Sequence, residues 1–241
     1  MFRSTAAAGA CLRAIAQLVS PGICPVCRAK PVRSHFYACS ECSEALRALP
    51  HPRCTACGGS KDGILDECSE CLRHPKRPWE TALSVFPFQG LPRELVHRFK
   101  YQNETWLAPL LARLMAETVQ SSAIEQVGAV IPVPLHGLKL MKRGYNQSAL
   151  LAEEIGRLLD VPVCSALRRH GRRPSQTRLD YRRRQQNAKN TFSYRKRVAV
   201  AGRHLLLVDD VFTTGATLAA ATSALNEGAP AKTTVLTLAR G

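Results

Sequence analysis

The sequence predicts an α/β protein, in which a parallel sheet covered by helices on both faces follows a small cysteine-rich module. Two observations support this fold class. From about residue 81 to the end of the chain, apolar segments of strand length alternate with segments of helical period. Before them, four Cys-x-x-Cys pairs follow one another between residues 24 and 71. The predicted chain therefore has two parts of different character.

The elements of the second part follow in a regular order. Strands are predicted at residues 82–86, 129–133, 198–200, 204–208 and 234–239, and helices at 106–118, 147–159 and 217–227. The strand segments are apolar along almost their whole length, which is typical of parallel strands that are buried on both faces. Because parallel sheets bind ligands at the carboxyl ends of their strands, functional residues are expected there.

The composition is that of a globular chain with an unusual charge. The 241 residues are 45% hydrophobic, and the formal net charge is +16. No apolar run approaches the ~20 residues that span a bilayer, so no membrane span is predicted. In residues 1–19, Arg13 and Gln17 interrupt the apolar stretch, which favours a short amphipathic helix over the alternative, a signal or transit peptide.

The cysteine pairs predict metal binding. A Cys-x-x-Cys turn presents two thiolates from one tight knuckle, and two knuckles complete a tetrahedral zinc site. Eight thiolates therefore predict two structural Zn²⁺ ions. Since every ligand is a cysteine, the sites are closed and the ions fold the module without catalysing a reaction. The predicted ligands are Cys24, Cys27, Cys39, Cys42, Cys54, Cys57, Cys68 and Cys71.

Alternatives to zinc are a disulfide framework and a redox-active pair. Nothing in the sequence indicates secretion, and a redox pair occurs once rather than four times at even spacing. Zinc is therefore favoured, and thiolate ligands indicate a reducing, cytoplasmic compartment. Sequential pairing of the knuckles is the simpler arrangement, and a crossed pairing stays open. The segment LRHPKRPWE has neither helical nor strand period, which places a domain boundary around residues 73–79.

A candidate phosphate-binding loop follows the strand at 204–208. The strand runs through Val208 into two adjacent carboxylates, Asp209 and Asp210, and then into the short loop Thr213–Thr217, which opens a helix. Small residues and a glycine let backbone N–H groups converge at the positive end of the helix. Two carboxylates beside a phosphate suit the hydroxyl groups of a sugar phosphate. Helix and turn capping is the alternative, and it explains only one or two of these residues.

At these residues the chain resembles the type I phosphoribosyltransferases, whose signature binds phosphoribosyl pyrophosphate (PRPP). Further segments are similar to the competence protein F (ComF) family in particular, and they include the cysteine knuckles. The similar segments are Phe99–Tyr101, Pro132–His136, Lys142–Gln147, Gln176, Arg183, Asn187 and Phe192.

The resemblance implies a domain organisation and a site. Residues 1–75 would form the amino-terminal helix and a double zinc ribbon, and residues 80–241 a phosphoribosyltransferase-like domain. Asp209 and Asp210 would hold the ribose hydroxyls and serve as the catalytic residues. The loop at Pro134–Gly137 would lie at the pyrophosphate. The implied PRPP-binding residues are Asp209, Asp210, Thr213, Thr214, Gly215, Ala216, Thr217 and Arg143. Mg²⁺ would be chelated with PRPP, easing loss of pyrophosphate as C1 gains oxocarbenium character.

The basic charge is concentrated in residues 168–203, where thirteen lysines and arginines face one acidic residue, Asp180. Three interpretations stay open. Residues 168–190 could form a flap over PRPP that supplies Arg178 or Arg183 as a charge clamp. They could instead contact nucleic-acid phosphates, or form a solvated loop. Lys100 either reaches the site or ends a helix, and His136 is interpreted as structural rather than catalytic.

Two functions follow from these features. The first is a phosphoribosyltransferase-like protein that binds PRPP with Mg²⁺, takes an unknown acceptor and has a ComF-type role in DNA uptake. The second is a non-catalytic, PRPP-sensing adaptor that binds nucleic acid through residues 168–203 or a protein partner through the zinc ribbon.

Overall fold

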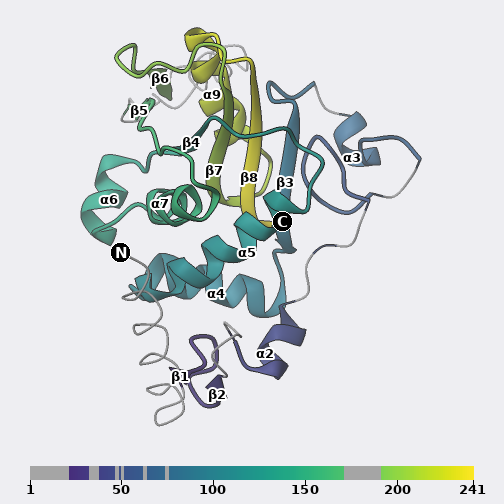
Figure 1. Ribbon diagram of the computed structural model, residues 1–241, viewed down its shortest axis with the longest axis vertical. Helices are drawn as coiled ribbons and strands as arrows, with labels where there is room; N and C mark the ends of the chain where they lie inside the picture. The colour runs from purple at the N-terminus through teal and green to yellow at the C-terminus, as the bar shows by residue number, and fades with distance from the viewer. Residues whose placement is uncertain are drawn as a thin grey trace, which may run out of the picture. The chain divides into compact units, whose positions relative to one another are not determined.

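The computed structural model describes residues 22–32, 38–46, 49, 52–61, 64–73, 76–170 and 191–241 (Figure 1). The chain divides into two compact units, Met1–Arg47 and Ala48–Gly241. The helix predicted within residues 1–19 lies outside the described residues. The boundary proposed at residues 73–79 falls inside the second unit, so the second half of the cysteine module belongs to the same compact unit as the sheet.

The first unit is built around its cysteines. Strands β1 (Gly22–Ile23) and β2 (Pro31–Val32) pair in antiparallel fashion around the first knuckle, and the short helix α2 (Ser40–Ala45) carries the second. Such short elements bury little apolar surface. A metal ion bound by the cysteines would therefore supply much of the folding free energy of this unit.

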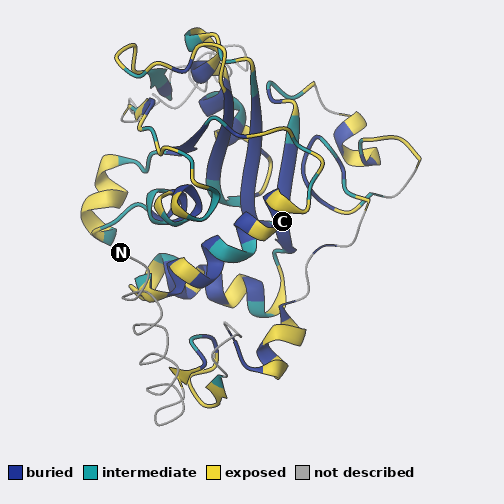
Figure 2. Cartoon of the chain, in the orientation of Figure 1, coloured by how far each residue is buried: buried dark blue, intermediate teal, exposed yellow. Residues whose placement is uncertain are grey.

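The second unit contains a four-stranded parallel sheet, which confirms the predicted fold class. Its strand order is β3 (Thr81–Pro87), β8 (Lys232–Arg240), β7 (His204–Phe212) and β4 (Ala129–Pro132). Figure 2 shows the strands in dark blue because they are buried almost throughout. All three pairings are parallel, so the carboxyl ends of the strands meet at one edge.

Helices cover both faces of this sheet, as Figure 1 shows. Helices α5 (Ala108–Gln120) and α7 (Gln147–Leu159) pack together against one face. Helix α9 (Ala216–Leu225) packs on the other face, in one core cluster with Leu205, Leu207 and Val235. Alternate residues of β7 therefore point to opposite layers, as the period of a strand requires.

Shorter elements connect these layers. Helix α4 (Gly90–Tyr101) follows β3 and leads through the 3₁₀ turn η1 (Thr105–Leu107) into α5. Helix α6 (Gly137–Arg143) precedes α7, helix α3 (Ser69–Leu72) lies in the cysteine module, and η2 (Asn226–Gly228) ends α9. Strands β5 (Leu167–Arg169) and β6 (Phe192–Tyr194) form an antiparallel hairpin base.

The strand predicted at residues 198–200 is wrong. Val198 lies in a turn, in which its N–H donates to the carbonyl of Arg195 at 2.9 Å, and Val200 is fully buried without joining a ladder. Val200 packs into the same core cluster as α9. Its apolar character therefore reflects burial in the core rather than strand pairing.

Candidate ligand site and metal centres

The two adjacent aspartates lie within strand β7 rather than after it. The ladder with β8 continues past them, pairing Asp209 with Thr237 and Phe212 with Arg240. Both aspartates are half-buried at the carboxyl end of the sheet. This is the edge at which parallel α/β sheets bind their ligands.

Asp209 is held by two donors on the same oxygen. Ser148 Oγ, at the start of α7, donates to Asp209 Oδ1 at 2.8 Å, and the N–H of Asp210 donates to it at 2.9 Å. Burial, followed by the charge of Asp210, raises the pKa of Asp209 to about 7, although both hydrogen bonds and the charge of Lys100 oppose this shift. The carboxyl group of Asp209 therefore titrates near neutral pH.

Asp210 is paired with a cation from another element. Lys100 Nζ lies 2.8 Å from Asp210 Oδ1, and both side chains are largely buried, 19% and 13% exposed. Lys100 stands in the last turn of α4. The sequence left open whether Lys100 ends a helix or reaches the aspartates, and in the structure it does both.

The segment between α6 and α7 fixes the position of Ser148. Asn146 caps α7 by accepting from the N–H of Ser148 at 3.2 Å, and its own Nδ2 donates to the carbonyl of Val133 at 3.0 Å. The hydroxyl of Tyr145 donates to the carbonyl of Phe99. Together these bonds connect the carboxyl end of α4 and the segment after β4 to the start of α7. Ser148 was not among the residues predicted from the sequence.

Arg143 and His136 lie at opposite ends of α6. Arg143 Nη1 donates to Gln147 Oε1 at 2.7 Å, and its guanidinium lies 4.9 Å from the ring centre of Tyr101. The structure thus brings Arg143 next to the end of α4, and the contacts described for it are not with the aspartates. His136 caps α6, because its Nδ1 accepts from the N–H of Leu138 at 3.3 Å, which supports a structural role.

The candidate phosphate loop, Thr213–Thr217, leads directly from β7 into α9. Gly215 has φ 77°, a left-handed conformation, and a Cβ atom there would lie 2.7 Å from Cζ of Phe212. Only glycine fits both the conformation and the space. Thr213, Thr214, Ala216 and Thr217 are exposed around it, at the amino end of a ten-residue helix. The first N–H groups of such a helix have no partner within the helix and can bind an anion.

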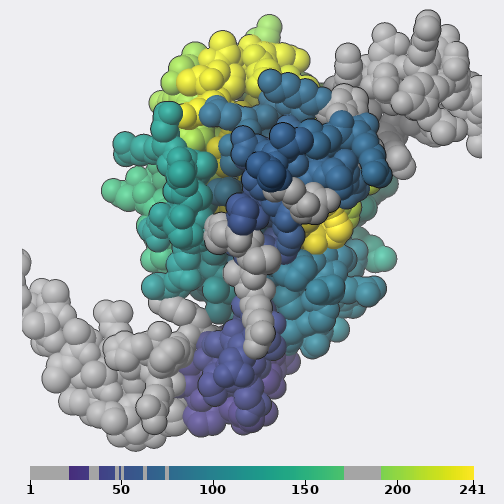
Figure 3. Space-filling view, turned by 90° about the vertical axis from the view of Figure 1, so that its right-hand side faces the viewer, coloured from purple at the N-terminus to yellow at the C-terminus, as the bar shows by residue number. Residues whose placement is uncertain are grey.

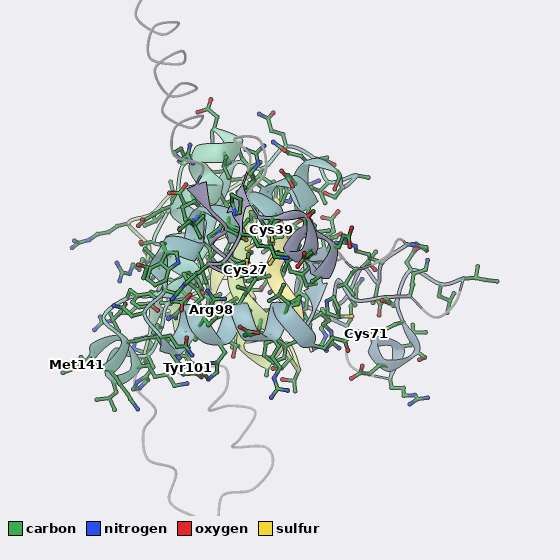
Figure 4. The ribbon with its side chains drawn as sticks, turned by 90° about the horizontal axis from the view of Figure 1, so that it is seen from below. Cys27, Cys39, Cys71, Arg98, Tyr101 and Met141 are labelled. Atoms are coloured by element: carbon green, nitrogen blue, oxygen red, sulfur yellow. The ribbon has the colours of Figure 1, made fainter. Side chains whose placement is uncertain are left out.

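The eight cysteines form two groups of four, in sequential pairing. Cys24, Cys27, Cys39 and Cys42 form one group and Cys54, Cys57, Cys68 and Cys71 the other, with the sulfur atoms of each group within 4.8 Å of one another. The Sγ atoms of Cys27 and Cys39 are 3.8 Å apart, and Figure 4 shows these two residues side by side. We call these groups the first and the second cysteine cluster.

Both clusters fit zinc. A tetrahedron with Zn–S bonds of ~2.3 Å has sulfur atoms about 3.8 Å apart. The measured separations, 3.8 Å in the first cluster and 4.0 Å between Cys57 and Cys68 in the second, agree with this value. All ligand positions are taken by sulfur, so the ions would be structural.

The two clusters repeat one local design. In each, the N–H of the third cysteine donates to the sulfur of the first, at 3.3 Å from Cys39 to Cys24 and at 3.2 Å from Cys68 to Cys54. In each, the third cysteine also precedes a short helix, α2 or α3. A backbone hydrogen bond to sulfur thus joins the two knuckles of each cluster.

The basic segment is described only at its base. Residues 171–190, with Arg178 and Arg183, lie outside the described residues. At the base, Arg169 Nη1 donates to the carbonyl of Pro134 at 3.4 Å, and the Arg169 guanidinium lies 5.1 Å from the ring centre of Phe192. The β5–β6 hairpin therefore contacts the loop after β4, where the resemblance places pyrophosphate.

Comparison with known proteins decides the family. The chain is 33% identical over 207 residues to the DNA utilization protein YhgH of Escherichia coli K12, covering 84% of this chain and 89% of that protein. It is 33% identical over 190 residues to competence protein F of Haemophilus influenzae, covering 75% and 80%. The chain belongs to the competence protein F family. A more distant member of this ComF family, competence protein ComFC of Bacillus subtilis, is 26% identical over 84% of the chain and 83% of that protein.

No family model matches the chain. Among solved structures, a glutamine PRPP amidotransferase from B. subtilis aligns over 55% of this chain and 26% of its own, with 20% identity and a TM-score of 0.41. The adenine phosphoribosyltransferase of Saccharomyces cerevisiae aligns over 83% and 86%, with 16% identity and a TM-score of 0.32. Within the described residues, no helix of this ComF protein is both long and apolar enough to cross a membrane.

Proposed function

We propose that this protein binds PRPP together with Mg²⁺ at the carboxyl end of β7 and acts in DNA uptake or DNA utilization. The observation that carries the proposal is that two acidic residues and a candidate phosphate loop lie next to each other at the end of β7. A pair of half-buried carboxylates stands three residues before an exposed, glycine-containing loop at a helix amino end. A phosphorylated pentose needs both, since its hydroxyls donate hydrogen bonds and its phosphate accepts them.

Each part of the ligand has a proposed set of partners. The 5′-phosphate would accept from the N–H groups and hydroxyls of residues 213–217. The ribose hydroxyls would donate to Asp209 and Asp210, and Mg²⁺ bound with them would neutralise the charge of the leaving pyrophosphate. Lys100 already balances part of the charge of the two acids through its 2.8 Å ion pair. Ser148 keeps Asp209 oriented through its hydrogen bond of 2.8 Å.

DNA is the proposed macromolecular partner. The relatives are named for DNA utilization and competence, and the β5–β6 hairpin base carries a hollow of about 570 Å³ whose lining includes Arg168, Arg195, Lys196 and Arg197. Basic side chains bind nucleic-acid phosphates without reading the sequence, so we expect DNA affinity to fall steeply with salt. The thiolate clusters suit a reducing cytoplasm as the place of action.

Isothermal titration calorimetry tests the ligand proposal. PRPP with Mg²⁺ is titrated into the zinc-loaded wild type, into the double variant Asp209→Asn with Asp210→Asn, and into Asp160→Asn as a matched control. Asp160 caps the far end of α7 in a left-handed conformation, which asparagine tolerates. We expect binding to wild type and control, and at least about tenfold weaker binding to the double variant. No binding to wild type would refute the proposal.

A non-catalytic, PRPP-sensing adaptor is the second candidate function. The closed sulfur coordination of both clusters favours it, because such sites stabilise modules that bind partners. Release of pyrophosphate in the presence of candidate acceptors separates the two functions. Release above the rate without acceptor supports a transferase, whereas tight PRPP binding without release across the acceptors supports the adaptor.

A further inference from the structure

The second cysteine cluster packs into the same core as Phe212, the residue directly before the candidate phosphate loop. Phe212, fully buried, is the last residue of β7 and stands directly before Thr213. Phe212 and all four cysteines of the second cluster belong to one buried group of side chains. Figure 3 shows the blue surface of the chain around the second cluster next to yellow surface of the carboxyl-terminal residues.

The first knuckle of this cluster is linked to Phe212 through Trp79. Ala56 lies between Cys54 and Cys57, and its carbonyl accepts from Trp79 Nε1 at 3.0 Å. The Trp79 ring then meets the Phe212 ring edge-on, with ring centres 5.9 Å apart and an angle of 89° between the planes. Because Trp79 is only 5% exposed, a shift of the knuckle must move the Phe212 ring or open the core.

The second knuckle is linked to Phe212 through Arg240. Glu70 lies between Cys68 and Cys71, and Arg240 Nη2 is 3.5 Å from Glu70 Oε2. The Arg240 guanidinium lies 5.0 Å from the ring centre of Phe212, in cation–π distance. Each knuckle of the second cluster is thus linked through one intermediate residue to Phe212, the residue directly before the loop.

Arg77 contacts both aromatic residues and lies next to Gly215 of the loop. Its guanidinium lies 5.6 Å from the ring centre of Trp79 and 5.8 Å from that of Phe212. Its Nη1 is 3.2 Å from the point at which a side chain on Gly215 would begin. Within the described part of the chain no carboxylate forms an ion pair with Arg77, and its buried Nε has no hydrogen-bond partner. Beside the helix amino end there is therefore a cation to which no carboxylate of the described residues is paired.

We propose that Arg77 is a positioning residue for the phosphate of the ligand, and that metal binding in the second cysteine cluster sets its place under the loop. This inference rests on the proposed function, because it takes Thr213–Thr217 as the phosphate loop. The positive charge of Arg77 adds to the partial charge of the α9 amino end. The cluster holds Trp79 and Arg240 in place, and these hold Phe212, on which Gly215 and Arg77 pack. All the described residues in this chain of contacts belong to the second unit, Ala48–Gly241.

Variants of Arg77 test the electrostatic half of the proposal. PRPP with Mg²⁺ is titrated into Arg77→Gln, Arg77→Lys and, as a control, Lys76→Gln, which removes an exposed neighbouring charge. We expect Arg77→Gln to weaken binding by about tenfold and to reduce its salt dependence, with Arg77→Lys restoring most of both. Equal affinity and equal salt dependence of wild type and Arg77→Gln would overturn this role. A purely structural role would give loss of affinity without a change in salt dependence.

Variants of the two clusters test the coupling. Two double variants are compared: Cys54→Ser with Cys57→Ser in the second cluster, and Cys24→Ser with Cys27→Ser in the first. PRPP titration and amide hydrogen exchange of residues 213–219 are measured for both. We expect amide exchange in the loop to rise by about tenfold in the second-cluster variant, Cys54→Ser with Cys57→Ser, and to stay unchanged in the first-cluster variant. Trp79→Phe keeps an aromatic ring but loses the indole N–H that bonds to Ala56, so it reports the coupling even if the cysteine variant fails to fold. Wild-type exchange rates in Trp79→Phe would overturn the coupling.

The two proposals fail in distinguishable ways. If the wild type binds no PRPP, the proposed function fails, and the exchange comparison still decides whether the second cluster controls the loop. If the wild type binds PRPP and the Arg77 and second-cluster variants bind it equally well, the proposed function stands and this inference fails.

Discussion

Lys100 Nζ and Asp210 Oδ1 lie 2.8 Å apart, so that the last turn of α4 is joined directly to the carboxyl end of β7. This pair places a cation beside two acids that would otherwise repel each other. Asp209, the other acid, takes its hydrogen bonds from Ser148 and from the backbone of Asp210. The site is therefore assembled from three elements that are far apart in the sequence.

Removal of the Lys100 charge should raise the pKa of Asp209 further. The charge of Lys100 is one of the influences that lower this pKa, which burial and Asp210 raise to about 7. In Lys100→Met we expect PRPP binding to reach its full strength only at a higher pH than in wild type, because ionised Asp209 is the hydrogen-bond acceptor. Titration calorimetry from pH 6 to pH 9 measures this shift. Lys139→Met, on the exposed face of α6, is the control and should behave as wild type.

The stability of the ligand-free protein should depend on the same group. The folded-state pKa of Asp209, about 7, lies above the ordinary value of 3.8, so the folded protein binds this proton more tightly than the unfolded chain. The contribution of Asp209 to the free energy of unfolding therefore falls as the pH rises from about 4 to about 7. Urea unfolding at several pH values should show a flatter pH dependence for Asp209→Asn over this range. An unchanged slope would contradict the assignment.

Gly215→Ala should abolish ligand binding through a clash as well as through strain. Alanine at φ 77° costs about 1 kcal/mol in backbone strain, and its Cβ would also meet the Phe212 ring at 2.7 Å. Gly202→Ala is a matched control, because its φ is 68° and nothing lies within 4 Å of the added atom. We expect a similar strain cost in the control with normal PRPP affinity. Normal affinity in Gly215→Ala would show that the loop tolerates displacement.

Elemental analysis should find close to two zinc ions per chain. The four sulfur atoms of each cluster lie within 4.8 Å of one another, which suits one ion for each cluster. Cys24→Ser with Cys27→Ser should bind one ion fewer and leave the second cluster loaded. One ion in the wild type would mean that half of the thiols are not metal ligands.

Much of this architecture could be predicted because it depends on local patterns. The helix at residues 147–159 was predicted with its observed ends, since its apolar stripe is regular. The four knuckles were also recognised from their spacing, and of the two pairings left open the structure shows the sequential one. In both cases the signal and the structure lie in the same short segment.

The features that sequence analysis missed depend on distant contacts. Ser148 resembles any residue in the first turn of a helix until β7 brings Asp209 to within 2.8 Å of it. Arg77 belongs to a segment that shows no strand or helix period, and only the packing of Trp79 on Phe212 places it under the loop. Val200 was misassigned to a strand because burial in a core and burial in a sheet give the same apolar pattern.

A crystal structure of the zinc-loaded protein with PRPP and Mg²⁺ tests the central claim most directly. We predict the 5′-phosphate against the backbone N–H groups of residues 213–217 and the two ribose hydroxyls within hydrogen-bond distance of Asp209 and Asp210. An empty loop at saturating ligand, or a sugar phosphate bound away from these two carboxylates, would contradict it.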